Sequence, residues 1–503
     1  MNKKESIIII GAGIGGLASA CMLAKKGYDV TIVEKNESVG GRARVFEQNG
    51  FIFDMGPSWY MMPEVFEHFF ELMGEKISDY YTLKKLSPSY RVFLKSDKSH
   101  YDFFGDIDKN KETFEKIEPG SGQVLVKFLD KLKLQYSIAY NEFMFKNYNS
   151  IFDFLTWSVA KVGWKLPLLK KQKQIIESRF KSEILQKVLQ YQMVLLGTAP
   201  GDCPGIYSMM NYVDFGLGVW YPDGGVWKLP EAMEKIAIKN GVKIMKNSPV
   251  SEIIVEDNIA KGIRLTNNDE KIFADIVISN ADITYTDQHL LKAPYQEHSE
   301  KYWDSRMLAP SAFILYLGIK DKIPSLEHHN LIFSKDWSKG FDQIFHNPKW
   351  PDDPSIYISA PSKSDKNIAP ADCENLFVLV PIAPGLTYDD NFEKEYTEKV
   401  LSEIENYAGV NNIRDRIIFK KTYSIKNFEI DYNAYKGTAL GLAHTINQTA
   451  LFRPNNIHKT IKNLFYVGAG TNPGIGMPIC IISAELVYKR ITKNEDVHPL
   501  KSL

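Results

Sequence analysis

Cysteine is scarce in this sequence, and neither sign of charge is in excess. The chain has four cysteines among its 503 residues, and no two of them form a C-x-x-C pair. This spacing argues against a disulfide framework and against a zinc site, and it favours a reducing cytosol. The 61 Lys and Arg residues balance the 61 Asp and Glu residues, so nothing in the charge points to nucleic acid as a partner.

Long apolar runs are also absent from the sequence after its first helical stretch. No segment after residue 24 is apolar over a length that would span a bilayer. Hydrophobic residues make up 44% of the chain and charged residues 24%, which is ordinary for a globular protein. Because 503 residues are too many for one hydrophobic core, we expect two or more domains.

A glycine-rich motif near the beginning predicts a dinucleotide site. The sequence G-A-G-I-G-G at residues 11–16 follows the run Ile7–Ile10, which predicts a buried parallel strand. Leu17–Ala24 carries apolar residues at helical spacing, so free N–H groups at the start of this helix would face a pyrophosphate. Glu34 follows a second strand and is expected to take two ribose hydroxyls, which disfavours a 2′-phosphate.

The same region has a rival reading as an export signal or a membrane span. Residues 7–24 carry no charge and stand behind Lys3 and Lys4, and Cys21 ends a stretch that loosely imitates a lipoprotein cleavage site. Four glycines in the supposed apolar core and the coherent βαβ continuation argue against this reading.

Two further glycine-rich segments extend the expected site. Gly40-Gly41-Arg42-Ala43 permits another close backbone approach, and Arg42 can neutralise phosphate charge. A surface turn would explain these glycines but not the nearby Asp54-x-Gly56-Pro57. Near the other end of the chain, the loop at residues 470–478 opens a helix with Pro478 in its first turn. That helix start could face the anionic edge of a reduced flavin, although an ordinary αβ junction would look similar.

No second G-x-G-x-x-G motif is present. A flavin enzyme reduced by NAD(P)H usually needs a second dinucleotide site, so electrons are expected to enter from the organic substrate. They would then leave to oxygen, a quinone or another small acceptor.

The order of patterns predicts an α/β fold with a discontinuous nucleotide-binding domain. Helical periodicity occupies residues 121–143 and 174–196, and an amphipathic helix is expected at 394–407. Strand-like runs lie at 242–245, 251–255, 276–279, 312–318, 376–381 and 464–467, with a last helix at 478–490. We therefore expect a Rossmann-like domain from residues 1–80, 222–288 and 455–503. A discontinuous α+β substrate domain would use 81–221 and 289–454, with a helical layer at about 121–200 that faces a membrane.

Taken together, these motifs resemble the bacterial phytoene desaturase family of carotenoid-modifying flavoenzymes, which is more distantly related to amine oxidases. The resemblance covers nearly the whole chain. It is carried by residues 11–34, by Gly40-Gly41-Arg42, by Tyr221-Pro222-Asp223-Gly224-Gly225, by Ser279-Asn280-Ala281-Asp282, and by residues 463–483. The last segment is the narrowest signature, and Asn472 stands where a histidine, glutamine or threonine is more usual.

The resemblance implies FAD bound across the three pieces of the first domain, with Val250 at the adenine end. The residues expected at FAD are Gly11, Gly13, Ile14, Gly15, Gly16, Glu34, Lys35, Gly40, Gly41, Arg42, Ala43, Gly56, Pro57, Ser58, Val250, Asn280, Ala281, Asp282, Gly470, Thr471, Gly476 and Met477. The rest of the chain would form a long apolar tunnel, and the implied reaction removes two hydrogens across a C–C single bond of a carotenoid.

Several activities within and beyond this family remain open at this stage. The substrate could be phytoene, a later acyclic carotene, or a hydroxylated carotenoid desaturated at its 3,4 bond. A carotenoid isomerase, a saturase and a terminal-methyl oxidase would share the flavin motifs. A prenyl-lipid escort protein of related architecture would bind lipid without using flavin, and it would not be expected to keep both ends of a flavin site.

For the base that accepts the second hydrogen as a proton, the resemblance offers Asp153. It lies between aromatic residues in Ile151-Phe152-Asp153-Phe154-Leu155, where burial could raise its pKa. The arginine that often follows three residues later in the family is Thr156 here. A structural role within a helix is the alternative for Asp153.

A mixed basic and apolar stretch predicts contact with the inner face of the cytoplasmic membrane. A water-insoluble carotene must come from a bilayer, and this stretch suits docking on an anionic surface. Its apolar members are Trp157, Trp164, Leu166, Leu168 and Leu169, and its basic members are Lys161, Lys165, Lys170, Lys171 and Lys173. A solvated basic face over core residues is the alternative.

Overall fold

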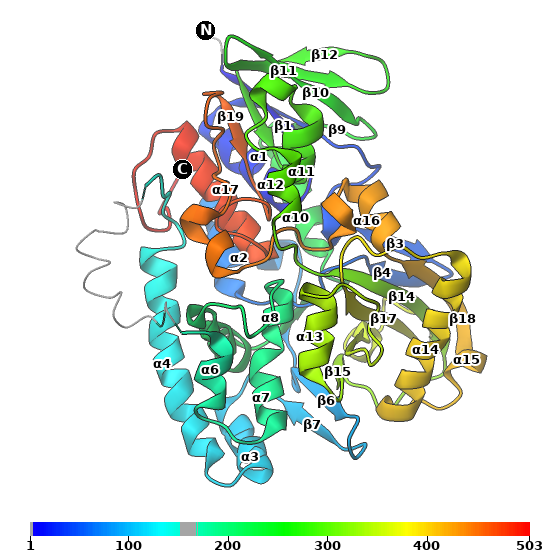
Figure 1. Ribbon diagram of the computed structural model, residues 1–503. Helices are drawn as coiled ribbons and strands as arrows, with labels where there is room; N and C mark the ends of the chain where they lie inside the picture. Colours follow the sequence, from blue (N-terminus) through cyan, green and yellow to red (C-terminus); the bar gives the residue numbers. More distant parts are fainter. Residues whose placement is uncertain (1–3, 151–166, 168–169) are drawn as a thin grey trace.

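Five parallel strands form one sheet from three distant parts of the chain (Figure 1). The computed structural model describes residues 4–150, 167 and 170–503. The strand order is β19-β13-β1-β2-β9, and every pairing is parallel. The strands are β1 (Ser6–Ile10), β2 (Asp29–Val33), β9 (Lys243–Met245), β13 (Ile276–Ser279) and β19 (Leu464–Tyr466). The α/β fold and the strands expected in these places are confirmed.

The four consecutive isoleucines of β1 are explained by burial on both faces of this sheet. Ile7 and Ile9 join the apolar core shared with the covering helices, whereas Ile8 and Ile10 join a second core on the opposite face. The covering helices are α1 (Ile14–Lys26), α2 (Pro63–Met73), α10 (Lys228–Lys239) and α17 (Met477–Ile491). The opposite face is covered by the small antiparallel sheet of β10 (Val250–Glu256), β11 (Ile259–Leu265) and β12 (Lys271–Phe273). Strands buried on both sides are typical of parallel sheets.

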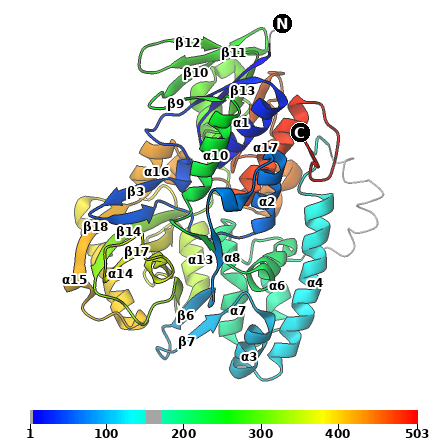
Figure 2. The ribbon, with the colours of Figure 1, turned by 180° about the vertical axis from the view of Figure 1, so that it is seen from behind.

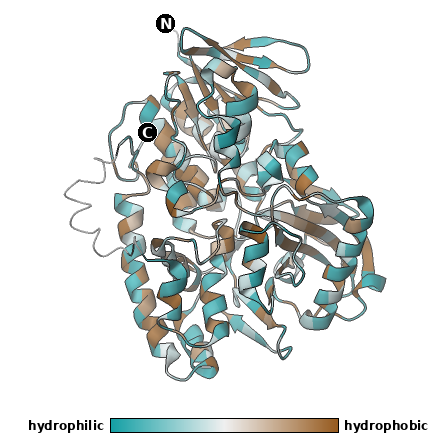
Figure 3. Ribbon diagram, in the orientation of Figure 1, coloured by the Kyte–Doolittle hydropathy of each residue, from teal (hydrophilic) through white to brown (hydrophobic). Residues whose placement is uncertain are grey.

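A second, larger sheet has seven strands in the order β18-β14-β17-β16-β15-β6-β7. Its pairings are antiparallel except for β6 with β15. The strands are β6 (Tyr90–Leu94), β7 (His100–Phe103), β14 (Ser311–Lys320), β15 (His329–Phe333), β16 (Ile356–Ser359), β17 (Cys373–Ile382) and β18 (Ile417–Tyr423). Figure 3 shows the hydrophobic colouring of β14 and β17. Those two strands were predicted, whereas β6, β7, β15, β16 and β18 were not.

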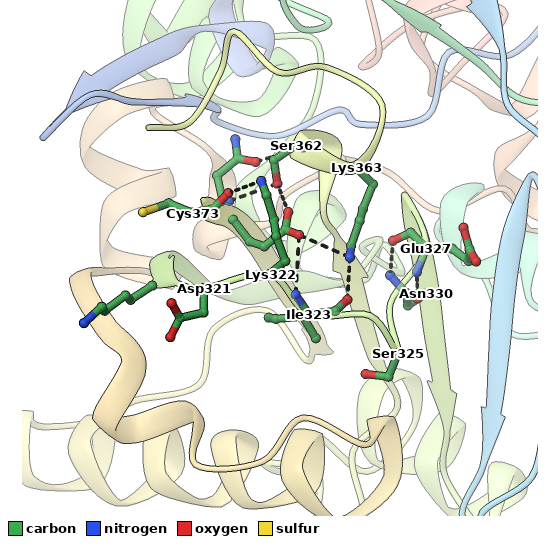
Figure 4. Close-up of polar contacts among 12 residues, drawn as sticks. Asp321, Lys322, Ile323, Ser325, Glu327, Asn330, Ser362, Lys363 and Cys373 are labelled. Atoms are coloured by element: carbon green, nitrogen blue, oxygen red, sulfur yellow. Dashed lines mark hydrogen bonds and ion pairs between the residues drawn. The ribbon is translucent and has the colours of Figure 1, made fainter. Parts of the chain in front are cut away.

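Helix α14 (Asp390–Ala408) packs its apolar stripe on the seven-stranded sheet, as expected for residues 394–407. Helices α13 (Trp337–Phe345), α15 (Ile413–Arg416) and α16 (Ile425–Tyr432) complete this part of the molecule, whereas α12 (Glu300–Asp304) packs Trp303 into the core beside the parallel sheet. At one edge of the sheet, Lys322 Nζ donates to Cys373 O at 2.7 Å, and Lys363 pairs with the buried Glu374 at 3.1 Å (Figure 4). These contacts fix the turn that leads into β15.

A layer of helices stands beside both sheets, which the view from behind in Figure 2 also shows. It consists of α3 (Ile107–Ile117), α4 (Ser121–Glu142), α6 (Gln172–Glu177), α7 (Glu183–Gln190), α8 (Gln192–Leu195) and α9 (Met210–Tyr212). The prediction at 121–143 is confirmed. The stretch at 174–196 is not one helix, because the Glu118 carboxylate accepts from Lys181 N and Ser182 N and holds a break before α7. Among the described residues, no helix combines the length and apolar character that crossing a bilayer requires.

Two short two-stranded sheets accompany the parallel sheet and the larger one. One is the hairpin of β3 (Val45–Gln48) and β4 (Phe51–Asp54). The other is not a hairpin but an antiparallel pair of two strands distant in the chain, β5 (Leu83–Lys85) and β8 (Trp220–Pro222). Tyr316 OH donates to Met55 O at 2.7 Å, and Asn375 Nδ2 donates to Ile52 O at 2.8 Å. The β3–β4 hairpin is therefore linked to the seven-stranded sheet by hydrogen bonds as well as by apolar packing.

A buried ion pair fastens the last helix to the helical layer. Lys489 Nζ lies 3.1 Å from Glu485 Oε1 one turn earlier, and each of the two side chains is 1% exposed. Lys489 Nζ also donates to Phe145 O and His498 O, while His68 Nε2 lies 2.8 Å from the other oxygen of Glu485. Removing one partner would leave a buried charge without compensation, which is far costlier than losing a surface pair.

We expect Lys489→Met to lower the free energy of unfolding by about 3–5 kcal/mol, because the buried Glu485 would lose its ammonium partner and keep only His68 and the Leu500 N–H. Denaturant titration followed by circular dichroism measures this change. The matched control is Lys235→Met, which removes a pair at the same i,i+4 spacing, with Lys235 60% exposed and Glu231 29% exposed. The control should change stability by roughly 0.5 kcal/mol or less. Equal effects of the two variants would contradict the structural role of the buried pair.

Candidate functional site

The glycine turn after β1 brings three parts of the chain into close contact. Gly11 has φ +96°, a backbone conformation that L side chains rarely adopt. A Cβ at Gly13 would lie 2.9 Å from Asn280 Nδ2, and one at Gly15 would lie 2.8 Å from Asn280 Oδ1. Helix α1 begins after Gly13 without any side-chain cap, so its first N–H groups are free for an anion.

Gly16 has a different role from the one expected. Its position within α1 is buried, and a Cβ there would overlap Gly11 O. The other expected residues of the turn, Gly11, Gly13, Ile14 and Gly15, line a cavity, and Gly16 does not. Gly16 therefore closes the turn rather than facing a ligand.

Glu34 is buried at the end of β2, and its carboxylate is held by two backbone N–H groups. Ala12 N donates to Oε2 at 2.7 Å and Asn36 N donates to Oε1 at 2.9 Å. Each oxygen keeps a lone pair, so the carboxylate can still accept from ribose hydroxyls, and Glu34 lines the cavity. Lys35 also lines it, but its ammonium donates to Ile430 O and Asn433 Oδ1. Burial lowers the pKa of Lys35 against the opposing effect of Asp431.

The second glycine pair lies directly against the first turn. Gly40 pairs with Gly13 in an isolated β-bridge, and a Cβ at Gly41 would lie 3.2 Å from Gly13 Cα. Beside them, Arg42 Nε is buried and has no hydrogen-bond partner among the described residues. Arg42 and Ala43 both line the cavity. An unpartnered guanidinium N–H at a cavity wall fits the phosphate charge of FAD.

Asp54 of the predicted Asp54-x-Gly56-Pro57 motif is a structural residue. Its carboxylate accepts from Val226 N and Trp227 N, both at 2.9 Å, so it fixes the segment that begins with Tyr221. Burial raises the pKa of Asp54 to about 7, against the effect of these two bonds. Gly56, Pro57 and Ser58, which follow it, line the cavity.

The middle and the last segments of the expected site meet at the same edge of the parallel sheet. Asn280, Ala281 and Asp282 follow β13 and line the cavity, as does Val250 at the start of β10. Asp282 accepts from Thr284 N and Tyr285 N, and burial raises its pKa.

Gly476 and Met477 open α17 and also line the cavity, and no side chain caps this helix. Gly470 and Thr471 do not line it. A Cβ at Gly470 would meet Ile283, and Thr471 Oγ1 donates to Pro454 O at 2.8 Å. These two residues support the loop before Gly476 from the side away from the cavity.

One continuous cavity of about 940 Å³ extends from the glycine turn to α13. Beyond the expected cofactor residues its wall is largely apolar, and it comes from the helical layer and the seven-stranded sheet. Leu195, Met209, Leu331, Phe341 and Ile356 are examples of this wall. The upper end of the usual volume range for ligand sites is about 1,000 Å³, so the space suits a large ligand.

A few polar side chains lie in or directly behind the apolar wall. Ser58 was predicted from the sequence, whereas Tyr357 and His444, which line the cavity, and His329, which does not line it, were missed. Tyr357 OH lies 2.7 Å from Ser58 Oγ and 2.8 Å from His329 Nδ1. His444 Nδ1 donates to Leu196 O at 2.9 Å. Burial lowers the pKa of His444 to about 3 and holds that of His329 well below its usual value, so both imidazoles are neutral. Nothing local in the sequence marks these residues, since they meet only through strand pairing and chain reversal.

The predicted base and most of the predicted docking stretch lie outside the described residues. These are Asp153, Thr156, Trp157, Lys161, Trp164, Lys165, Leu166, Leu168 and Leu169. Lys170, Lys171 and Lys173 are described and lie at the start of α6. Across the described part of the chain, no cluster of His, Cys, Asp and Glu could hold a metal ion.

Comparisons with known proteins agree with this geometry. The model of the flavin containing amine oxidoreductase family matches residues 14–491. The chain is 43% identical to the carotenoid 3,4-desaturase of Haloarcula japonica, over 96% of this chain and 97% of that one. It is 33% identical to the zeta-carotene-forming phytoene desaturase of Myxococcus xanthus, over 97% and 94% of the two chains. An oxidoreductase from Methanosarcina mazei, 18% identical, shares the fold with a TM-score of 0.63 over 96% of this chain and 100% of that one.

We expect Gly15→Ala to weaken FAD binding about tenfold or more. The added methyl group would lie 2.8 Å from Asn280 Oδ1 and 3.1 Å from Gly468 Cα, so it would push apart the segments that surround the site. The flavin-to-protein ratio and the Kd of reconstitution measure the effect. The control is Gly241→Ala, which is also strained by its φ of +86° but has no atom within 4 Å of the new Cβ. A Gly15→Ala protein with its full flavin complement would argue against this arrangement.

Proposed function

The chain belongs to the flavin containing amine oxidoreductase family, and from this premise we propose that it is an FAD-dependent carotenoid desaturase. It would remove two hydrogens from an acyclic or partly cyclised carotene and so extend the polyene. The observation that carries the proposal is the single cavity that joins the nucleotide-binding turn to a long apolar wall. The names of the relatives from Haloarcula japonica and Myxococcus xanthus support a carotenoid as the substrate class.

In this proposal the N-termini of α1 and α17 bind different parts of FAD. The free N–H groups of α1 and the unpartnered Arg42 Nε would hold the pyrophosphate, and Glu34 would hold the ribose. Val250 would lie at the adenine, and the start of α17 at Met477 would face the anionic edge of the ring system. When bound, the flavin supplies the acceptor for a hydride.

The chain's own contribution to the reaction is mainly alignment in a dry cavity. A C–H bond beside conjugated double bonds releases hydride readily once it is held next to an acceptor, because the polyene spreads the positive charge. The walls at Leu195, Ile344 and Ile356 offer such a carotene close apolar packing. An ammonium substrate would need charged or polar partners to offset its desolvation in this part of the cavity.

The name of the relative from Haloarcula japonica favours 3,4-desaturation of a carotenoid over desaturation of phytoene as the specific reaction. Isomerase, saturase and terminal-oxidase activities remain the alternatives, because each would use the same cofactor and cavity. The uncapped N-termini of α1 and α17 and the side chain of Arg42 disfavour a prenyl-lipid escort protein, because such a protein does not use a flavin and would not require these groups. Because a second dinucleotide motif is missing, we propose oxygen or a quinone as the electron acceptor.

Expression in cells that accumulate different carotenoid precursors should give products with two fewer hydrogens per step, separated by chromatography and identified by mass. The purified protein should also show flavin absorption bands. The control is Gly15→Ala, which should give little product in the same cells. An isomerase would give products of unchanged mass, a saturase would add two hydrogens, and an oxidase would add oxygen. A colourless protein that cannot be reconstituted with FAD would favour a lipid carrier.

We propose that the carotene enters from the inner face of the cytoplasmic membrane. Phe143, Met144, Lys146 and Tyr148 line the cavity, and they immediately precede the basic and apolar stretch singled out in the sequence. The described residues Lys170, Lys171 and Lys173 add positive charge beside this side of the molecule. Apolar and basic residues together suit an anionic bilayer surface.

Changing Trp164, Leu168 and Leu169 together to serine should reduce retention on anionic liposomes by about tenfold or more, because apolar burial in the bilayer would be lost. Co-sedimentation measures the bound fraction. Retention should also fall with added salt and on neutral liposomes, since the basic residues contribute Coulomb attraction. A matched control changes Leu134, Ile418 and Ile430, all exposed and far from this stretch in the sequence, to serine. Equal retention of the two triple variants and the wild type would eliminate the docking proposal.

A further inference from the structure

Asp214 is a buried carboxylate beside the cavity, and no positively charged side chain in the described part of the chain pairs with it. Its side chain is fully buried, and its Oδ2 accepts three hydrogen bonds, from Tyr90 OH at 2.9 Å, Tyr191 OH at 3.0 Å and Gln192 Nε2 at 2.7 Å. Its Oδ1 is buried and has no hydrogen-bond partner among the described residues. A buried acid held only by neutral donors is costly and is typical of functional sites.

Local backbone structure supports a special role for this position. Asp214 lies in the π-helical turn Val213–Leu217, and such turns occur frequently at functional sites. Tyr191 lies at the junction of α7 and α8, directly before the wall residues Val194 and Leu195. A π-helical turn and a helix junction thus place the carboxylate and the tyrosine together.

Of the two tyrosines that bind Asp214, only one lines the cavity. Tyr191 belongs to the cavity wall, and Tyr90 does not. The ring of Tyr191 lies 6.0 Å from that of Trp59, which directly follows the expected cofactor segment ending at Ser58. Tyr191 is therefore near the cofactor end of the cavity, with Asp214 immediately behind it.

We propose that Tyr191 and Asp214 form the relay that accepts the proton lost by the substrate during desaturation. This inference rests on the proposed function. One carbon of the C–C bond loses hydride, with its electron pair, to a two-electron acceptor, the oxidised flavin. The neighbouring carbon loses a proton to Tyr191 Oη, and the electrons of that C–H bond become the new π bond. The original Tyr191 proton passes to Asp214 Oδ2, so Tyr191 remains neutral and Asp214 becomes neutral.

The surroundings of Asp214 allow this uptake near neutral pH. Burial raises the pKa of Asp214 to about 6, against the lowering effect of its three hydrogen bonds. The titratable groups that face it are Tyr90 from β6 and Tyr191 from the α7–α8 junction, and burial raises the pKa of both phenols. Helices α3, α4 and α9 pack against the π-helical turn, but in the described part of the chain none forms an ion pair or hydrogen bond with the carboxylate.

The relay also places negative charge beside a wall that must face a developing carbocation. Ions are poorly stabilised in an apolar cavity, so a fixed carboxylate near the reacting bond has a large effect on a charged transition state. Above its pKa the carboxylate is ionised and can stabilise the cation. When the substrate loses its proton the cation disappears, and uptake of that proton neutralises the carboxylate. Proton acceptance and electrostatic stabilisation are therefore expected to depend on the same group.

Three variants separate the relay from a structural role. Tyr191→Phe keeps the ring in the wall but removes the relaying hydroxyl, and Asp214→Asn keeps the shape but removes the acceptor. The matched control is Tyr90→Phe, which removes a hydrogen bond to the same oxygen from the side away from the cavity. Flavin content and thermal midpoint are measured for each variant to confirm that it folds.

The rate of flavin bleaching is followed after anaerobic mixing with carotene. Tyr191→Phe and Asp214→Asn should slow it about a hundredfold at unchanged KM, the usual scale for losing acid–base help. Tyr90→Phe should retain the plateau rate within about threefold. A Tyr191→Phe enzyme that bleaches as fast as the wild type would overturn the relay. If no carotene bleaches the wild type itself, the proposed function fails, which is a different observation.

The pH dependence gives a second, independent readout. Since Asp214 must be ionised to accept the proton, the wild-type rate should fall as the pH drops through about 6. Tyr90→Phe should move this acid limb to higher pH, because one bond that stabilises the ionised form is lost. Infrared titration of the resting protein should show carboxyl groups protonating near this range, because burial also raises the pKa of Asp54 to about 7, and Asp214→Asn should lose one of these signals. If Asp153→Asn abolishes the acid limb while Asp214→Asn keeps it, Asp153 is the acceptor and the inference is wrong.

Discussion

The close approach of Asn280 to the glycine turn is the contact on which the rest of this structure depends. Asn280 Nδ2 donates to Gly11 O, and Gly15 and Gly468 leave no space for a Cβ beside the same amide. These residues follow β1, β13 and β19, which are parallel neighbours in one sheet. Parallel strands bring their carboxyl ends to one edge, so segments from the beginning, middle and end of the chain meet there. The cofactor end of the cavity exists because these three segments can approach so closely.

The neutral state of the imidazoles and phenols in and behind the wall is the second constraint on the cavity. His329 and His444 are kept uncharged by burial, and burial likewise raises the pKa of Tyr357 and Tyr207, so these phenols stay protonated. Each makes a hydrogen bond that satisfies part of its polarity without adding charge. Neutral groups of this kind can face an apolar chain without an ion being desolvated, although Lys146, Asp353 and Asp431 also line the cavity. Asp214 differs from these residues because it lies behind Tyr191 and accepts hydrogen bonds from neutral donors.

Carboxylates that look alike in the sequence have distinct tasks in the fold. Glu34 accepts hydrogen bonds from two backbone N–H groups but still faces the cavity. Both carboxylate oxygens of Asp54 accept from backbone N–H groups of the segment after Pro222. Asp282 caps a short helix beside the cofactor end. The difference depends on which backbone N–H groups the fold brings within reach, and short motifs do not record that.

The sequence by itself determined the parallel sheet, the glycine turn and the helices that flank it. Residues 7–34 carry their own signals, because strand burial, turn glycines and helical periodicity act over a few neighbouring positions. Only the tertiary structure decided that Gly16, Gly470 and Thr471 stand behind the cavity rather than in its wall. It also decided which polar groups face the substrate space. Ser58 and Tyr357 are 299 positions apart, and Tyr90 and Asp214 are 124 apart. Contacts over such separations arise from strand pairing and packing between distant elements, and no local pattern encodes them.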